Sequence, residues 1–391
     1  MKNQNKSFIW LIIFLVGFPQ ISETIYTPSL SYLASDFGVT DNQIQKTLSI
    51  YFAGFAVGVF SWGILSDIIG RKSSMMVGIL LYITGSFLCL QSHSFCFLLF
   101  ARFVQALGAA VGSNVSQTML RDVFSDKERV NVFSTISAVL AFSPAIGPLL
   151  GSIVTAVWNV YTVFTLLIII GCIAFFWSLF GLKETLPSHS KSSYDFRRIA
   201  GEIRKDKAFW IYGGLIGVAN GVIFSYYGEA PFIFIDYFKF SIVQYGCIGF
   251  IVALASFSGA RYCKRMNVRK TNQQILFRGN SLFFFGSVVF LLSVLYLSFN
   301  YTLLMVAILV SVFVIFFGLS CMLPVCLSGA LVNHKGNLGI SGAVLGLYYY
   351  SVVGGITYLM SYVHTSSLMF FPLFLLFWFI TNSILIKLNG K

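Results

Sequence analysis

Between two long apolar segments lies the stretch Gly63-Ile64-Leu65-Ser66-Asp67-Ile68-Ile69-Gly70-Arg71-Lys72. Its glycines permit a tight turn and a close approach of the flanking helices, and Asp67 can cap a helix N-terminus or pair with a neighbouring arginine. The apolar segments on either side, at roughly 44–65 and 73–92, each reach the length of about 20 residues that crosses a bilayer. The stretch therefore predicts a turn between two membrane-spanning helices.

The composition of the whole chain also favours a membrane protein. Of its 391 residues, 57% are hydrophobic and only 10% are charged, and the mean hydropathy is +0.83. A soluble domain carries about 25% charged residues, because its surface must face water. These values exclude a soluble globular domain, a disordered chain, a collagen, a coiled coil and a secreted disulfide scaffold.

Twelve apolar segments indicate an all-α integral membrane protein with 12 transmembrane helices. A polar stretch after the sixth segment is the only long polar connection, so we expect two six-helix halves. The predicted organisation is an N-terminal half (1–182), an inter-half loop (183–207) and a C-terminal half (208–391). The segments lie at roughly 8–30, 44–65, 73–92, 95–118, 130–156, 159–182, 208–235, 242–262, 275–297, 300–328, 339–362 and 366–388.

The basic residues predict the orientation of the chain. One set of alternate loops holds 22 of the 26 Lys and Arg residues, and the opposite set holds two. Cytoplasmic loops of membrane proteins carry such an excess of positive charge. We therefore expect both termini and the loop 183–207 in the cytoplasm. The net charge of +13 is explained in this way, without a nucleic-acid partner.

An arginine inside the segment 95–118 is the first candidate functional residue. Arg102, Gln105 and Ser113 fall on one face of the expected helix. An arginine within a span costs several kcal/mol unless it is paired or hydrated, which favours the wall of a water-filled cavity. The alternative is an arginine near the outer end of the helix that extends its head group to the interface.

Two carboxylates are the remaining candidates. Of the 13 acidic residues, only Glu23 and Glu229 lie within predicted spans, where an ionised carboxylate is costly and favours proton uptake. The alternative for each is a structural partner of Arg102 or an acid near the outer surface. Aromatic runs such as 348–350 and 283–285 are interpreted as packing or lipid-facing residues. The polar neighbours on the same helix faces are Gln20, Tyr26 and Thr27 for Glu23, and Ser225 and Tyr226 for Glu229.

The fifth segment carries a pattern of prolines and small residues. Gly147 and Gly151 are four residues apart and form a smooth helix face for close contact with a neighbour. Pro144 and Pro148 are expected to bend the helix. The pattern predicts how this helix packs, and it does not by itself predict what is transported.

Several of these motifs resemble a known family. The stretch 63–72 resembles the signature loop of the major facilitator superfamily, and the segment 102–110 resembles its RxxqGxgaa motif. The segment 143–152 resembles the antiporter motif gxxxGPxxGG, with Ser152 in place of the last glycine. Together with 26–30 and 183–187, these matches resemble the bicyclomycin/chloramphenicol-resistance branch of drug:proton antiporters. The N-terminal half matches closely and the C-terminal half loosely.

The resemblance implies alternating access around one midplane cavity, and export of a small drug-like compound against protons. From their position within the spans we expect proton coupling by Glu23, Glu229 and Arg102. The resemblance also implies a gating motif of Gly63, Asp67, Gly70, Arg71 and Lys72, and a packing motif of Pro144, Gly147, Pro148 and Gly151. The expected substrate-binding residues are Gln20, Glu23, Tyr26, Thr27, Arg102, Gln105, Ser113, Ser225, Tyr226 and Glu229.

The chain also departs from this branch. The branch has an Asp four residues before the proline of the first helix, where this chain has Thr24, with Glu23 one step earlier. A dedicated metabolite or siderophore carrier, exporting or importing, is therefore the alternative. Seven cysteines without paired spacing and four scattered histidines predict no metal site. We expect no enzymatic activity and no cofactor other than the proton gradient, and we expect a monomer whose partners are substrate, protons and lipid.

Overall fold

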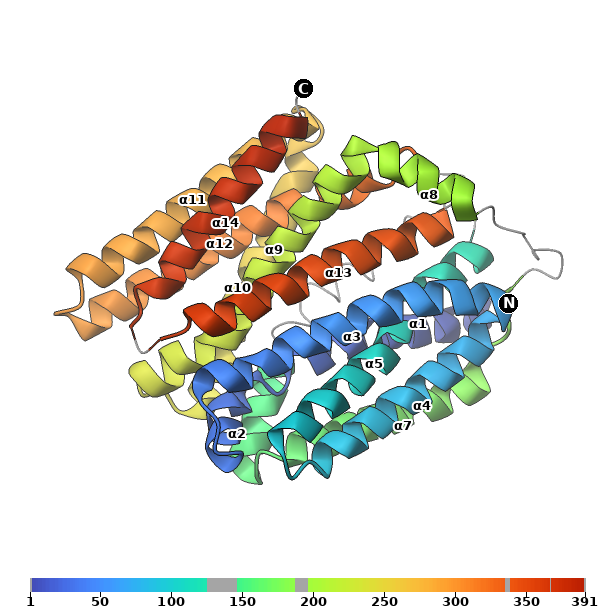
Figure 1. The fold of residues 1–391 in the computed structure, drawn as a ribbon, viewed down its shortest axis with the longest axis horizontal. Coiled ribbons are helices and arrows are strands. Elements are labelled where there is room, and N and C mark those ends of the chain that lie inside the picture. Colours follow the sequence, from blue (N-terminus) through green and yellow to red (C-terminus); the bar gives the residue numbers. More distant parts are fainter. Residues whose placement is uncertain (1, 125–145, 187–195, 335–337, 366, 390–391) are drawn as a thin grey trace.

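The computed structural model describes residues 2–124, 146–186, 196–334, 338–365 and 367–389, and all regular structure in these ranges is helical (Figure 1). The predicted all-α fold class is confirmed. The helices are α1 (Lys2–Thr24), α2 (Leu30–Asp36), α3 (Asp41–Ile68), α4 (Arg71–Leu90), α5 (Phe95–Val123), a helix over Ile146–Val157, α7 (Thr162–Gly181), α8 (Phe196–Lys205), α9 (Lys207–Pro231), α10 (Ile242–Met266), α11 (Asn272–Tyr296), α12 (Tyr301–Ala330), α13 (Leu338–Val363) and α14 (Phe370–Asn389).

Eleven helical stretches in the described part of the chain are long and apolar enough to cross a membrane. The segment predicted at 130–156 is described only over Ile146–Val157, so the rest of that prediction, including Pro144, lies outside the described residues. The inter-half loop 183–207 is described except for 187–195, and it contains the short helix α8.

Local signals explain where several helices begin. Thr40, Ser241 and Thr271 precede α3, α10 and α11, and the side chain of each accepts a hydrogen bond from the backbone three residues on. A glutamine at that third position accepts a hydrogen bond from the backbone N–H of the capping residue in return. These reciprocal bonds satisfy N–H groups that a helix N-terminus otherwise leaves unpaired.

The helix of the first span is interrupted directly after Glu23 and Thr24. Helix α1 ends at Thr24, a 3-10 turn (η1, Thr27–Ser29) follows, and α2 resumes at Leu30. Pro28 has no backbone N–H, and the Thr27 hydroxyl instead donates to the Thr24 carbonyl oxygen at 2.8 Å. The break places Glu23 in the last turn of α1.

The two halves meet along α3 and α13, which lie side by side in Figure 1. A Cβ on Gly354 of α13 would lie 3.4 Å from the Ser49 carbonyl oxygen of α3, so the two backbones are close. One apolar cluster is built almost wholly from residues before 183, and two others are built from residues after 198. Both ends of the chain lie on one side of the bundle, here called the terminal side, and α2 lies on the opposite, far side.

Candidate functional site

Arg102 lies buried in the first third of α5, between two aromatic rings. Its guanidinium carbon is 3.9 Å from the centroid of the Tyr26 ring and 4.3 Å from that of Tyr51. Its Nη1 donates to the side-chain oxygen of Gln105, whose amide donates in turn to the Ser86 hydroxyl at 2.8 Å. Arg102 is 0% exposed, so its head group does not reach a surface as an interfacial arginine would.

Arg102 also retains unused hydrogen-bonding capacity. Its Nε and Nη2 atoms are buried and have no hydrogen-bond partner among the described residues. Cation–π contacts with the two tyrosines offset part of the cost of burying this charge. The remaining positive charge acts on the surrounding groups, including the carboxylate of Glu23.

Glu23 lies at the junction of the two halves. Its side chain is 2% exposed, and its charge interacts with Arg102 and Tyr51 of the N-terminal half. It also interacts with Tyr349 and Tyr350, which belong to α13 in the C-terminal half. Their rings pack as the sequence predicted, Tyr349 against Tyr350 and Tyr350 against Phe55 of α3, and both also lie within the electrostatic influence of the buried carboxylate.

The other polar residues predicted around Glu23 divide into two groups. The Tyr26 hydroxyl is 3.2 Å from the Thr47 hydroxyl, and Thr27 bonds the backbone of α1, so both side chains are satisfied within the N-terminal half. Gln20 is half-buried one turn before Glu23. Of the predicted set, Glu23, Tyr26, Arg102 and Gln105 are brought together most closely.

A cavity on the terminal side approaches this buried cluster. It has a volume of about 260 Å³ and is lined by residues of both halves. Ser113 lines it, as predicted, and so does Tyr349, which also interacts with Glu23. Tyr349 thus lines the cavity and also lies within the electrostatic influence of the buried carboxylate. The remaining lining residues are Val59, Asn114, Gln117, Thr118, Arg121, Leu327, Leu331, Gly339, Gly342, Leu345 and Gly346.

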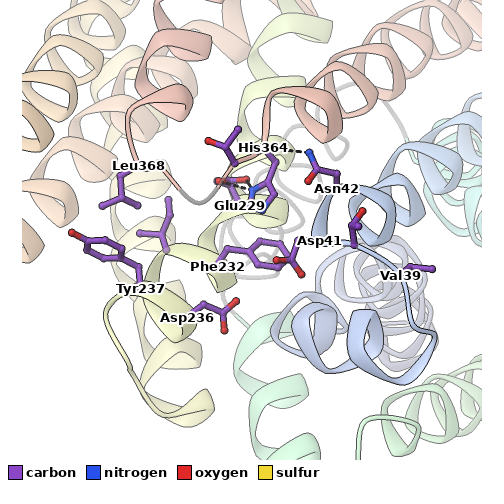
Figure 2. Close-up of a pocket in the computed structure, with 12 residues that line it drawn as sticks. Val39, Asp41, Asn42, Glu229, Phe232, Asp236, Tyr237, His364 and Leu368 are labelled. Carbon is purple, nitrogen blue, oxygen red and sulfur yellow. Dashed lines mark hydrogen bonds and ion pairs between the residues drawn. The ribbon is translucent and has the colours of Figure 1, made fainter.

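Glu229 occupies a different place, on the far side. It lines a cavity of about 630 Å³ together with His364, as Figure 2 shows. Its carboxylate accepts a hydrogen bond from the Gln45 amide at 2.9 Å and lies 2.8 Å from Nδ1 of His364. Glu23 and Glu229 thus have separate surroundings. Gln45 and His364 carried no sequence signal. They lie 319 positions apart in the chain, and each meets Glu229 only because of the fold.

Ser225 and Tyr226 lie within the C-terminal half. The Tyr226 ring packs edge-on against Phe316 at 5.1 Å between centroids. The hydroxyls of Ser225 and Tyr226 are buried and have no hydrogen-bond partner in the described ranges. In those ranges, moreover, no three His, Cys, Asp or Glu side chains are grouped so that they could hold a metal ion.

Gly147 and Gly151 pack directly against the break in the first span. A Cβ on Gly147 would collide with the Thr24 hydroxyl, and one on Gly151 would collide with the Ile25 carbonyl oxygen. The Ser152 hydroxyl donates to the Pro148 carbonyl oxygen at 2.5 Å. The small residues therefore allow this helix to lie against the turn that positions Glu23.

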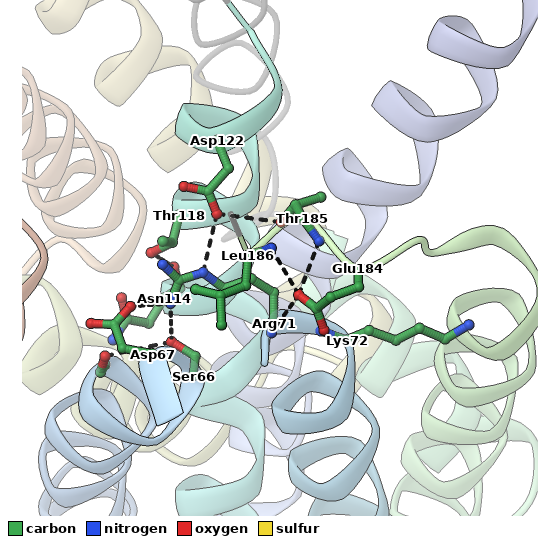
Figure 3. A network of polar contacts seen from close by, with 11 residues as sticks. Ser66, Asp67, Arg71, Lys72, Asn114, Thr118, Asp122, Glu184, Thr185 and Leu186 are labelled. Atoms are coloured by element: carbon green, nitrogen blue, oxygen red, sulfur yellow. Dashed lines mark hydrogen bonds and ion pairs between the residues drawn. The ribbon is translucent and has the colours of Figure 1, made fainter. Parts of the chain in front are cut away.

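The stretch 63–72 forms a network of charged groups, shown in Figure 3. Nη1 of Arg71 donates to the Asp67 carboxylate and, at 2.8 Å, to the Ser66 hydroxyl. Nε of Arg71 donates to Asp122 of α5 at 3.1 Å. The predicted pairing of Asp67 with a neighbouring arginine is present, and Arg71 joins the ends of α3, α4 and α5.

Glu184, from the segment after α7, caps the N-terminus of α4. Its two carboxylate oxygens accept the backbone N–H groups of Arg71 at 2.9 Å and Lys72 at 3.1 Å. Partial burial alone would raise the pKa of Glu184, but hydrogen bonds from four backbone N–H groups outweigh it and lower the pKa below its ordinary value. The ionised carboxylate is also favoured by the positive end of the α4 dipole.

Gly70 is required by this cap, which leads to a stability prediction. Its φ is +97°, and a Cβ there would lie 2.5 Å from a Glu184 carboxylate oxygen. We expect Gly70→Ala to destabilise the folded protein by about 1–3 kcal/mol, because it combines backbone strain with loss of the cap. Thermal unfolding of the purified protein in detergent measures this. An unchanged melting temperature would contradict the described cap.

Comparison with known proteins agrees with this geometry. The family model described as Major Facilitator Superfamily matches residues 9–361. An uncharacterized transporter of Rickettsia felis is 31% identical, over 93% of this chain and 91% of its own length. The multidrug resistance protein MdtL of Shewanella oneidensis is 30% identical, over 86% of this chain and 80% of its own length.

Solved structures share the fold. The xylose transporter XylE of E. coli, in a partially occluded inward open conformation, matches with a TM-score of 0.73 at 10% identity, over 96% of each chain. The peptide transporter POT in complex with alafosfalin matches with a TM-score of 0.74 at 14% identity, over 98% of this chain and 94% of its own. The matches in sequence and in fold agree, and the chain belongs to the major facilitator superfamily of membrane transporters.

Proposed function

We propose that this transporter exports small, drug-like organic compounds across a bacterial inner membrane in exchange for protons, by alternating access. One observation carries the proposal: Glu23 is buried where the two halves meet, and its charge interacts with Arg102 and with Tyr349, a residue that lines a cavity. The relatives named multidrug resistance protein MdtL support a drug-like substrate.

The chemistry of Glu23 supports proton coupling. An ionised carboxylate within a bilayer costs several kcal/mol unless a positive charge lies near it, so burial favours its protonated form. Arg102 supplies part of that positive charge and makes the ionised form attainable. Glu23 is therefore placed to gain and lose a proton as the cavity opens to one side and then to the other.

The proposed orientation places the terminal side in the cytoplasm, because the basic loops lie there. The far side then faces outward. In the described part of the chain, hydrogen bonds between the halves lie on this side, such as the one from Ser31 to Asp236 at 2.9 Å. The two halves are therefore joined by hydrogen bonds on the far side. A cysteine at the exposed Gly201 of α8 should react with an impermeant reagent only after cells are permeabilised.

The Arg71 network is proposed to act in gating, and Asp67 tests it. Asp67→Asn keeps the shape of the side chain but removes the charge that pairs with Arg71. We expect transport to fall several-fold with little change in thermal stability, because a gating group shifts the balance between two states. Normal flux in correctly inserted Asp67→Asn protein would contradict the gating role. The exposed pair of Arg198 and Glu202 on α8 provides the control, and Glu202→Gln should leave flux unchanged.

The substrate class is tested by transport in proteoliposomes. A cationic dye such as ethidium and a neutral antibiotic such as chloramphenicol should be moved against their gradients when a pH difference is imposed. A dedicated metabolite or siderophore carrier is the second candidate, because Glu23 departs from the pattern of the drug-exporter branch. Such a carrier would leave both drugs unmoved and would transport a metabolite or a siderophore instead.

A further inference from the structure

The far-side cavity contains a buried cluster that the coupling site does not use. Glu229 of α9 is 5% exposed, and His364, which follows α13, is 7% exposed. Nδ1 of His364 lies 2.9 and 2.8 Å from the two carboxylate oxygens of Glu229. The Phe232 ring covers the imidazole, with 4.6 Å between ring centroids.

The cluster also joins the two halves of the molecule. Glu229 and His364 belong to the C-terminal half, and Gln45, on α3 of the N-terminal half, donates to the Glu229 carboxylate at 2.9 Å. Asn42 of α3 donates to the carbonyl oxygens of His364 at 2.7 Å and Ser361 at 2.9 Å. Figure 2 shows Asn42 next to His364. Separating the halves on this side must break these bonds.

We propose that Glu229 and His364 form a proton-dependent latch, which holds the far side closed while His364 is charged. Closing the far side removes the Glu229 carboxylate from water, at a cost that an opposite charge in contact can offset. A protonated His364 supplies that charge, whereas a neutral His364 leaves the buried carboxylate uncompensated. Loss of the proton therefore favours the open far side, where water solvates the carboxylate.

The charges around His364 support this direction. Burial opposes the charged imidazole, but the hydrogen bond and charge of Glu229, with the charges of Asp41 and Asp236, outweigh it and raise the pKa of His364. Two lysines lie near this region: Lys239 acts on Asp236, and Lys46 lies over the rings of Tyr358 and Tyr362. The Tyr237 side chain also lines the cavity. Opening to water weakens the interactions of His364 with Glu229, Asp41 and Asp236.

The sign of the pH dependence follows from linkage. A group whose pKa is higher in the closed state stabilises that state fully below its open-state pKa, and this stabilisation is lost as the pH rises through its closed-state pKa. The far side should therefore open more as the external pH rises.

The latch proton is distinct from the transported proton. The cavity around His364 is on the far side, so a proton taken up there on closing returns to the same side on opening. Such a proton does no transport work, but it shifts the balance between the two states. This inference rests on the proposed alternating access, and it adds a gate that senses the external pH, separate from Glu23.

A distance measurement tests the latch without any substrate. Spin labels would be placed at Ser35 of the N-terminal half and Ser298 of the C-terminal half, both exposed on the far side. Cys96, Cys172 and Cys247, the cysteines that are not fully buried, would be replaced by serine. Pulsed electron paramagnetic resonance in nanodiscs then gives the ratio of open to closed far side at each pH.

One linked proton changes this ratio by at most about tenfold per pH unit, and we expect a rise of about threefold to tenfold from pH 6 to pH 8. His364→Gln and Glu229→Gln should each abolish that rise. His93→Gln, at an exposed histidine on the same side, should retain it. A rise that persists in His364→Gln, or a ratio that is independent of pH in the parent protein, would overturn the latch. Transport plays no part in this readout, so failure of the latch and failure of the proposed export remain distinguishable.

Discussion

Replacing Glu23 by glutamine should abolish uphill, pH-driven transport while leaving substrate binding intact. Glutamine keeps the size and hydrogen-bonding capacity of the side chain but cannot exchange a proton. Glu23 is buried beside Arg102, so no bulk water can substitute for it as a proton acceptor without rearrangement. The expected loss is at least about tenfold in the rate of concentrative transport, in the range of a removed acid–base group.

Measurements of binding, exchange and uphill transport distinguish the possible roles of Glu23 in this variant. Binding is followed by the thermal stabilisation that a ligand gives to the folded protein. Exchange of labelled for unlabelled substrate shows whether the variant still changes state. Loss of binding as well as uphill transport would identify Glu23 as the site of a cationic substrate. Uphill transport of unchanged strength would show that the proton travels elsewhere. Asp36→Asn, at an exposed acid that ends α2 on the far side, provides a control that should retain coupled transport.

The second large effect is expected from Gly151→Ala. The added Cβ would collide with the carbonyl oxygen of Ile25, a backbone atom in the break that positions Glu23. Backbone cannot rotate away as a flexible side chain does, so the helix must move outward. We expect the variant to lose at least about 2–3 kcal/mol of stability, the range of overpacked cores, and to lose transport with it.

The same substitution at a different glycine provides the control. A Cβ on Gly355 of α13 would meet nothing within 4 Å. Gly355→Ala should therefore be neutral, or should stabilise its helix by up to about 1 kcal/mol through the better helix propensity of alanine. The comparison uses melting temperatures in one detergent. Equal effects at both positions would contradict the packing of the Ile146–Val157 helix against the first span.

The sequence was informative about features that repeat along one helix. Hydropathy located the spans, and the pattern around Arg102 predicted correctly that Gln105 would share its face, since the two side chains are hydrogen-bonded. The contact between Arg102 and Gln105 depends on helical spacing, which the sequence displays directly. The stretch 63–72 left two roles open for Asp67, a helix cap or a pair with a neighbouring arginine, and the structure shows the pair with Arg71 across the turn between α3 and α4.

Contacts between the halves could not be predicted in the same way. Tyr349 and Tyr350 reach Glu23 from more than 300 residues away, and His364 reaches Glu229 from a loop. No periodicity links such pairs, because their meeting depends on how α13 packs against α3. Glu184 was noticed as part of a motif, but its capping of α4 depends on the path of the chain after α7. The motif indicated that Glu184 is a residue of interest, but it did not predict that Glu184 contacts α4.

The central claim is exchange of substrate for protons, and the pH inside proteoliposomes tests it most directly. Vesicles with equal pH on both sides and a trapped pH dye would receive ethidium, or the first drug shown to move, from outside. Substrate entering down its own gradient should drive protons out, so the internal pH should rise, and Glu23→Gln should abolish the rise. Substrate entry with no change of internal pH, or with a fall, would contradict proton exchange.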